Sequence, residues 1–199
     1  MNMNSLRFVS LLVASLLAAV PVAAQSVDEM QQKAIQFLEV TQAADGSWTS
    51  PDAVGITGLV TTSLLMSGKT AEDPLVKRGL DFIVASQQST GGIHAATSRH
   101  QNYETCISML ALTEANKDGR FDSVIRKGEQ FLRGLQWDEG EGIETTDGAY
   151  GGGGYDSKQR PDMSNTQFLV EALKKAGVAE DDPAMQKALV FVSRAQNLE

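Results

Sequence analysis

Hydrophobic and polar positions alternate along the chain with the period of an α-helix, and one pattern of ten residues occurs four times. Its third copy runs from Lys127 to Gln136 and reads basic, small, two variable residues, Phe, aliphatic, three variable residues and Gln. The small residue, the Phe and the aliphatic residue stand at i, i+3 and i+4, so they share one face of a helix. The other copies run from Lys33 to Gln42, from Arg78 to Gln87 and from Lys187 to Gln196. The sequence therefore predicts four amphipathic helices of one type.

A second, more apolar type of helix is predicted between these copies. It covers about residues 57–66, and its equivalents cover residues 105–112 and 166–173. In each case a Thr is followed eleven residues later by Gly or Asn, which accept the left-handed conformation just past a helix end. These residues are Gly68, Asn116 and Gly177. The two helix types alternate, which gives seven helices and no strand.

Return of the same pattern at nearly regular intervals indicates a repeat protein. The four glutamines are 45, 49 and 60 residues apart. Stacked helix hairpins bury a continuous core between neighbours, so the apolar helices are expected inside and the Gln-bearing helices outside. The connecting loops are rich in Gly. The longest, from about Trp137 to Met163, is expected to be functional or mobile because such loops are rare in compact repeats.

The first 24 residues read as a secretory signal peptide. Arg7 precedes the apolar run 8–20, and Val22-Ala23-Ala24 fits a cleavage site of small residues. This run is short for a membrane span, and no later segment is long enough either. The expectation is a secreted or periplasmic protein with one repeat domain over residues 25–199. An uncleaved N-terminal anchor is the alternative.

Charge and cysteine content narrow the possible partners. The full chain has a net charge of −8; loss of Arg7 with the signal peptide leaves 16 basic against 25 acidic residues, or −9. Such acidity argues against a nucleic-acid partner or an anionic lipid surface. Cys106 is the only cysteine, which excludes an internal disulfide.

The glutamine pattern, with its Gly-rich turns and nearby tryptophans, resembles the Gln-Trp repeats of squalene–hopene and oxidosqualene cyclases and the related repeats of protein prenyltransferase β subunits. The resemblance implies an α/α toroid, in which inner and outer helix rings surround an apolar cavity. In that superfamily the repeated Gln bonds backbone groups at the ends of neighbouring outer helices and an aromatic residue stacks on it. This structural role is implied here for Gln42, Gln87, Gln136 and Gln196, with Trp48 and Trp137. The segment 150–177 looks like secreted bacterial members of unassigned activity.

Cyclase chemistry requires an unusually strong acid, because an alkene is a poor base. Squalene–hopene cyclases supply it from an Asp-x-Asp-Asp-Thr-Ala motif, in which paired carboxylates share a proton. The matching positions here are Asp162, Ser164 and Asn165. Ser and Asn are not acids, so Asp162 is the one remaining catalytic candidate, and its expected role is to cap the following helix.

Prenyltransferases instead bind zinc through Asp, Cys and His. The segment Tyr103-Glu104-Thr105-Cys106 resembles a Tyr-His-Thr-Cys segment of their β subunits, with Glu104 in place of the ligand His, and the Asp-x-Cys pair has no equivalent. His94 and His100 are interpreted as packing or surface residues. No metal and no cofactor are predicted. The four glycines at 151–154 are interpreted as backbone that needs positive φ, because no Gly-Lys-Ser/Thr follows them.

Seven helices make only part of a closed toroid, so the domain is expected to be incomplete and to self-associate or to be completed by another chain. The leading interpretation is an exported repeat protein that binds an apolar small molecule or a protein partner on its concave inner-helix face, without cyclase catalysis. Its candidate contacts are Tyr103, Tyr150, Tyr155, Asp162, Ser164 and Asn165. The alternatives are an isoprenoid-processing enzyme, either cyclase-like or transferase-like, and a structural interaction module.

Overall fold

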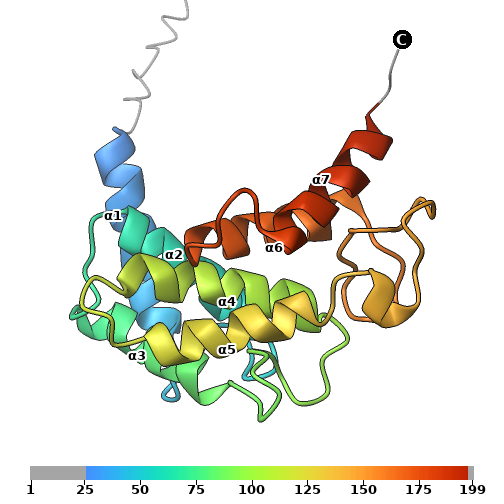
Figure 1. Ribbon diagram of the computed structural model, residues 1–199. Coiled ribbons are helices and arrows are strands. Elements are labelled where there is room, and N and C mark those ends of the chain that lie inside the picture. Colours follow the sequence, from blue (N-terminus) through green and yellow to red (C-terminus); the bar gives the residue numbers. More distant parts are fainter. Residues whose placement is uncertain (1–25, 197–199) are drawn as a thin grey trace, which may run out of the picture.

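The computed structural model describes residues 26–196, which fold into seven α-helices and one short 3-10 helix (Figure 1). The helices are α1 (Val27–Thr41), α2 (Val54–Met66), α3 (Pro74–Ala85), α4 (Gln101–Ala115), α5 (Asp122–Arg133), η1 (Glu139–Glu141), α6 (Met163–Lys175) and α7 (Pro183–Ala195). No strand occurs within this range; its only β-type pairings are two isolated bridges. The predicted all-α fold is therefore confirmed. The predicted signal peptide lies outside the described residues.

The helices form two layers, as the alternation of types predicts. Helices α2, α4 and α6 pack side by side, while α3 packs on α2 and α4, α5 on α4 and α6, and α7 on α6 (Figure 1). The apolar helices thus form an inner layer, and the Gln-bearing helices α1, α3, α5 and α7 lie outside it. Helix α4 is central: Cys106, Ile107, Met109, Ala111 and Leu112 are buried in it. The arrangement is a fragment of an α/α toroid.

A glutamine at or just after the end of α1, α3 and α5 joins each of these outer helices to the next one. The Nε2 group donates one hydrogen bond to a glycine carbonyl in the following loop and a second to a carbonyl in the first turn of the next outer helix. The bonds are Gln42 to Gly46 and Leu75, Gln87 to Gly91 and Val124, and Gln136 to Gly151 and Ala184, all between 2.9 and 3.1 Å. One amide thus satisfies two carbonyls that would otherwise need water. Gln196 is exposed at the C-cap of α7.

The same three loop glycines lie against the backbone of the next outer helix. Their φ angles are positive, and a Cβ atom on any of them would lie within about 2.5 Å of a carbonyl oxygen of the pattern's basic residue. The pairs are Gly46 with Arg78, Gly91 with Lys127, and Gly151 with Lys187. In the third repeat this glycine follows its Gln by 15 residues instead of 4, so the loop contains an insertion of 15 − 4 = 11 residues.

The inner helices begin earlier than predicted. They start at Val54, Gln101 and Met163, three or four residues before the Thr of the pattern. The reason is that each Thr hydroxyl accepts a hydrogen bond from a loop backbone N–H in place of capping its own helix. These bonds join Trp48 N to Thr57 at 3.2 Å, and Ile93 N to Thr105 and Gly153 N to Thr166 at 3.0 Å.

The two tryptophans occupy different positions in the repeat. Trp48 is buried, its backbone N–H meets the Thr hydroxyl, and its Nε1 donates to the Leu38 carbonyl at 2.9 Å, which anchors α1. Trp137 directly follows Gln136, inside the insertion. Its backbone pairs with Gly151 and Gly152, and its Nε1 atom is buried without a hydrogen-bond partner in the described part of the chain.

Candidate functional site

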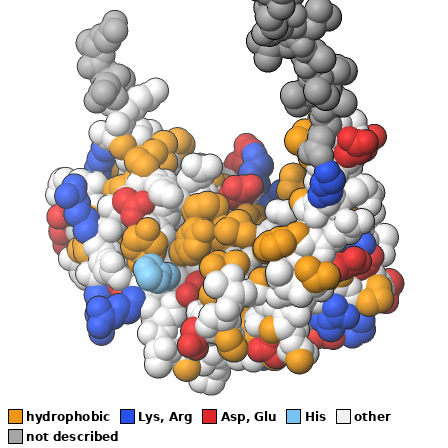
Figure 2. Space-filling view, turned by 180° about the vertical axis from the view of Figure 1, so that it is seen from behind, with side chains coloured by type: hydrophobic (Ala, Val, Ile, Leu, Met, Phe, Trp, Pro, Cys, Tyr) orange, Lys and Arg blue, Asp and Glu red, His pale blue; other side chains and the backbone are white. Residues whose placement is uncertain are grey.

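An open cavity lies at the N-terminal ends of the inner helices α2, α4 and α6, and we call this surface the inner face. Its volume is about 620 Å³. It is lined by Asp52, Ala53, Gly55, Ile56, His100, Tyr103, Glu104, Tyr155, Ser164 and Phe168. Viewed from behind, the molecule shows hydrophobic side chains gathered in the middle of the face (Figure 2). Three of the predicted contact residues, Tyr103, Tyr155 and Ser164, line this one cavity.

Two pairs of rings stand edge to face in the cavity wall. Tyr103 of α4 meets Phe168 of α6, with centroids 5.2 Å apart and planes at 86°. His100, which precedes α4, meets Tyr155 of the long loop, with centroids 4.8 Å apart and planes at 81°. Edge-to-face contact is a favoured geometry for such rings and fixes their orientation. This part of the wall is therefore built from the first turn of α4, the first turns of α6 and the loop between α5 and α6, and the start of α2 supplies the rest.

Asn102 holds that loop against α4. Its backbone N–H donates to the Tyr155 carbonyl at 2.9 Å, and its Nδ2 donates to the Gly154 carbonyl at 2.6 Å. Asn102 is buried, so both bonds are shielded from water. Sequence reasoning missed this residue. The available signal was that Asn102 neighbours Tyr103 in an apolar helix, where an amide needs partners.

The buried carboxylate of Glu104 lies at the floor of the cavity. Its Oε2 accepts a hydrogen bond from Ala95 N at 3.0 Å, and its Oε1 accepts one from the Ser98 hydroxyl at 2.7 Å. At this position the prenyltransferase segment carries a zinc ligand. Here the side chain fastens the loop 95–98 to α4.

Asp162 lies outside this cavity, at the N-cap of α6. Its Oδ1 accepts from Asn165 N at 2.9 Å, and its Oδ2 accepts from Asn165 Nδ2 at 2.7 Å. Asn165 is buried, whereas Asp162 faces a second pocket of about 550 Å³ that Arg160 and Arg194 also line. The predicted contact residues therefore fall into separate places, because Ser164 turns toward one pocket and Asp162 toward another.

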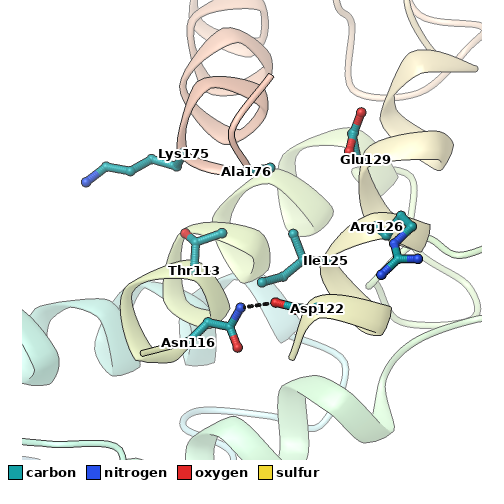
Figure 3. A pocket seen from close by; sticks show the side chains of 8 residues that line it. All are labelled: Thr113, Asn116, Asp122, Ile125, Arg126, Glu129, Lys175 and Ala176. Atoms are coloured by element: carbon teal, nitrogen blue, oxygen red, sulfur yellow. Dashed lines mark hydrogen bonds between the residues drawn. The ribbon is translucent and has the colours of Figure 1, made fainter. Parts of the chain in front are cut away.

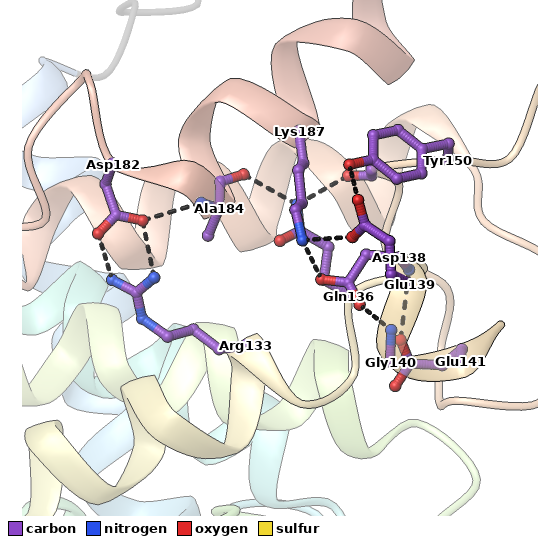
Figure 4. A network of polar contacts seen from close by, with 11 residues as sticks. Arg133, Gln136, Asp138, Glu139, Gly140, Glu141, Tyr150, Asp182, Ala184 and Lys187 are labelled. Atoms are coloured by element: carbon purple, nitrogen blue, oxygen red, sulfur yellow. Dashed lines mark hydrogen bonds and ion pairs between the residues drawn. The ribbon is translucent and has the colours of Figure 1, made fainter. Parts of the chain in front are cut away.

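Tyr150 belongs to a network of polar contacts that fastens the insertion to α7 (Figure 4). Its hydroxyl donates to Glu139 Oε1 at 2.8 Å, and Lys187 Nζ lies 2.7 Å from Glu139 Oε2 and 2.8 Å from Asp138 Oδ2. The hydrogen bond from Lys187 is the main reason why the pKa of Glu139 falls to about 2. Tyr150 is buried in this network and does not line the inner-face cavity.

This network should make the attachment of the insertion sensitive to acid. The pKa of Glu139 is below its ordinary value of 4.5, so the unfolded chain binds more protons than the native chain between about pH 4.5 and pH 2. The stabilisation is complete above about pH 5 and is lost as the pH falls toward 2. Glu141 opposes it, because burial raises the pKa of that carboxyl. Lys187→Met should move the pKa of Glu139 back toward 4.5, as measured by NMR titration of the carboxyl carbon.

Lys77→Met is the matched control for that measurement. Lys77 forms an exposed i,i+4 ion pair with Asp81 on α3, far along the chain from the insertion. The Lys77→Met substitution removes the same charge and should leave the pKa of Glu139 unchanged from that in the parent protein. An equal shift of the Glu139 pKa in both variants would contradict a local role for Lys187.

A smaller pocket of about 380 Å³ lies where the end of α4 meets α5 and α6 (Figure 3). Its wall is polar and carries both charge signs, from Asp122, Glu129, Arg126 and Lys175. Asn116 Nδ2 donates to Asp122 Oδ1 at 2.6 Å across its floor. None of the predicted contact residues lines it, and mixed charges give it no clear ligand preference.

The remaining candidate side chains, His94 and Cys106, are both buried. His94 is buried with its Nδ1 2.8 Å from the Ala95 carbonyl oxygen, and its ring packs on Phe131. Cys106 is fully buried, which raises the pKa of its thiol. Across residues 26–196, no three His, Cys, Asp or Glu side chains converge in a way that could hold a metal ion.

None of the helices within residues 26–196 combines the length and the apolar character that a membrane span requires.

Alternating inner and outer helices, joined by glutamine amides and glycine turns, define a protein of the α/α-toroid class. A family model described as the squalene–hopene cyclase C-terminal domain matches residues 49–199. This match covers well over half of the chain, and the chain therefore belongs to that family. No solved structure gives a significant match.

Proposed function

We propose that this squalene-cyclase-like domain is an exported binding module that takes up an apolar ligand in the inner-face cavity, without cyclase catalysis. The observation that carries the proposal is the cavity itself. About 620 Å³ of open space is walled by the rings of Tyr103 and Phe168 and by Ile56, whose side chain is 41% exposed. Ligand sites are typically concave and mostly apolar, with a few polar groups that fix orientation.

The absence of cyclase chemistry is proposed from the placement of Asp162. Its two carboxylate oxygens are engaged by the backbone N–H and the side-chain amide of Asn165, which is a helix-capping arrangement. A strong acid needs a second carboxylate to share its proton, and the neighbouring positions hold Ser164 and Asn165. An exported protein segment with apolar side chains is an alternative occupant of the same cavity.

Titration with the neutral fluorescent probe N-phenyl-1-naphthylamine tests the proposal. We expect saturable binding that Phe168→Ala weakens about tenfold, because loss of the ring removes apolar contact worth roughly 1–2 kcal/mol. Phe37→Ala is the matched control, since Phe37 is 64% exposed on α1 and does not line the cavity. Thermal unfolding of each variant checks its fold. Absence of saturable binding, or equal weakening in both variants, would overturn the proposal.

Product analysis after incubation with squalene and with prenyl diphosphates distinguishes a binding module from an isoprenoid-processing enzyme. We expect no product. Turnover that Asp162→Asn abolishes would instead establish the enzyme and make Asp162 its acid.

A further inference from the structure

We infer that the inner-face cavity prefers an organic cation, a positively charged nitrogen group that carries an apolar chain. This inference rests on the proposed function, because it names the chemistry of the ligand that the same cavity would take. It is argued from three features of the cavity wall: its charges, its aromatic rings and the space left above them.

The charged side chains in the wall are all of one sign. Asp52 and Glu104 line the cavity, and no Lys or Arg does. Glu104 accepts its hydrogen bonds from neutral donors, the Ala95 N–H and the Ser98 hydroxyl, so no cation cancels its charge. Within residues 26–196 the carboxylate of Asp52 makes no ion pair either. Asp52 is exposed and Glu104 is buried, so only the charge of Glu104 acts through a medium of lowered dielectric. Together the two uncompensated carboxylates attract a cation and repel an anion.

The rings supply the second feature. Tyr103, Tyr155 and Phe168 line the same space as these carboxylates. The negative faces of aromatic rings attract ammonium groups, and aromatic-lined sites are a recurrent way of binding alkylated nitrogen. An anion gains nothing from such rings, and a neutral chain gains only from their apolar surface.

Gly55, in the first turn of α2, lies close to Tyr103 and Glu104 of α4. A Cβ atom at this position would lie 3.3 Å from Cε1 of Tyr103 and 3.5 Å from Cγ of Glu104. A larger side chain would therefore stand over both groups. The absence of a side chain at Gly55 thus leaves the Tyr103 ring uncovered, while the buried Glu104 carboxylate acts on a ligand by its charge and not by direct contact.

The basic residues closest in sequence do not change this balance of charge within the wall. Arg99 precedes His100 and Lys158 lies three residues after Tyr155, but both are exposed and neither lines the cavity. Ser164 and His100 offer further hydrogen bonds. A cation with an apolar chain is the ligand class that uses the carboxylates, the rings and the apolar side chain of Ile56 together.

Three probes with the same decyl chain test the inference by calorimetry, each below its micelle-forming concentration. They are decyltrimethylammonium, decanol and decyl sulfate. We expect decyltrimethylammonium to bind at least tenfold more tightly than the other two. Asp52→Asn should reduce this preference to about threefold or less, and Tyr103→Leu should reduce it while retaining decanol binding. Asp181→Asn is the charge-matched control, because Asp181 is exposed and lines none of the pockets described above.

The possible outcomes distinguish a failure of the cation preference from a failure of the proposed function. Equal binding of all three probes would overturn the cation preference and leave the apolar binding module in place. Binding of none would overturn both. A cation preference that survives Asp52→Asn and Tyr103→Leu, or that is lost equally in Asp181→Asn, would overturn the assignment to this cavity.

Discussion

Replacement of Gly151 by alanine should lower the free energy of unfolding by about 4 kcal/mol or more, a loss that few single substitutions reach. The backbone of Gly151 has φ +85°, and a Cβ atom there would lie on the carbonyl oxygen of Lys187, far inside van der Waals contact. Neither partner can yield, because the carbonyl belongs to the backbone of α7 and the loop is held by Gln136. We expect α7 and the insertion to detach together, as measured by chemical denaturation and by hydrogen exchange of α7 amides.

Gly177→Ala separates the clash from the strain of the backbone conformation. Gly177 has φ +91°, and no atom lies within 4 Å of the place where a Cβ would be. Left-handed backbone alone costs an L-residue roughly 1–2 kcal/mol. The difference between the two variants therefore measures the close approach of the loop to α7. Similar losses in both would show that the loop moves away without cost, contrary to a tight joint between repeats.

Most of the fold could be predicted from the repeat pattern in the sequence. Phe and Gln return in register, and this register marks the outer helices because their apolar face and their terminal amide meet the same surroundings in every repeat. The role of the Thr could not be predicted. Thr57 looks like a helix start, since Thr is a common N-cap, yet its hydroxyl accepts from Trp48 N across the loop. Such a bond joins residues that only the folded loop brings together.

The candidate site was predicted less completely than the fold, again because it depends on contacts that form only in the folded chain. Tyr103, Tyr155 and Ser164 line one cavity, whereas Tyr150 is buried in the network around Lys187 and Asp162 faces a different pocket. The prediction placed all of these residues together on one concave face.

Two features of the structure place the predicted contact residues in different surroundings. The insertion after Gln136 turns Tyr150 toward α7, and the helical turn at the start of α6 points neighbouring side chains in different directions. An insertion can be recognised only when the spacing from Gln136 to Gly151 is compared with the other repeats. The direction of a loop side chain depends on contacts that no pattern encodes.

Gln136→Leu tests whether the repeated amide is what joins the outer helices. We expect it to lower the free energy of unfolding by about 3 kcal/mol, because two carbonyls, those of Gly151 and Ala184, lose their donor in a buried site. Gln130→Leu is the matched control: Gln130 is exposed on α5, and a surface substitution of this kind changes stability by no more than about 0.5 kcal/mol. Both are measured by urea denaturation.

The three glutamines make equivalent hydrogen bonds but differ in how deeply they are buried. This difference provides a second test of the role of the amide. Gln136 is buried, whereas Gln42 is half-buried, so water can replace the lost amide more readily at Gln42. Gln42→Leu should therefore cost less than Gln136→Leu. If the two cost the same, or if Gln136→Leu costs no more than Gln130→Leu, packing of the apolar faces and not the amide holds the layers in register. The order Gln136, Gln42, Gln130 is expected because the cost of an unpaired carbonyl grows as water is excluded from it.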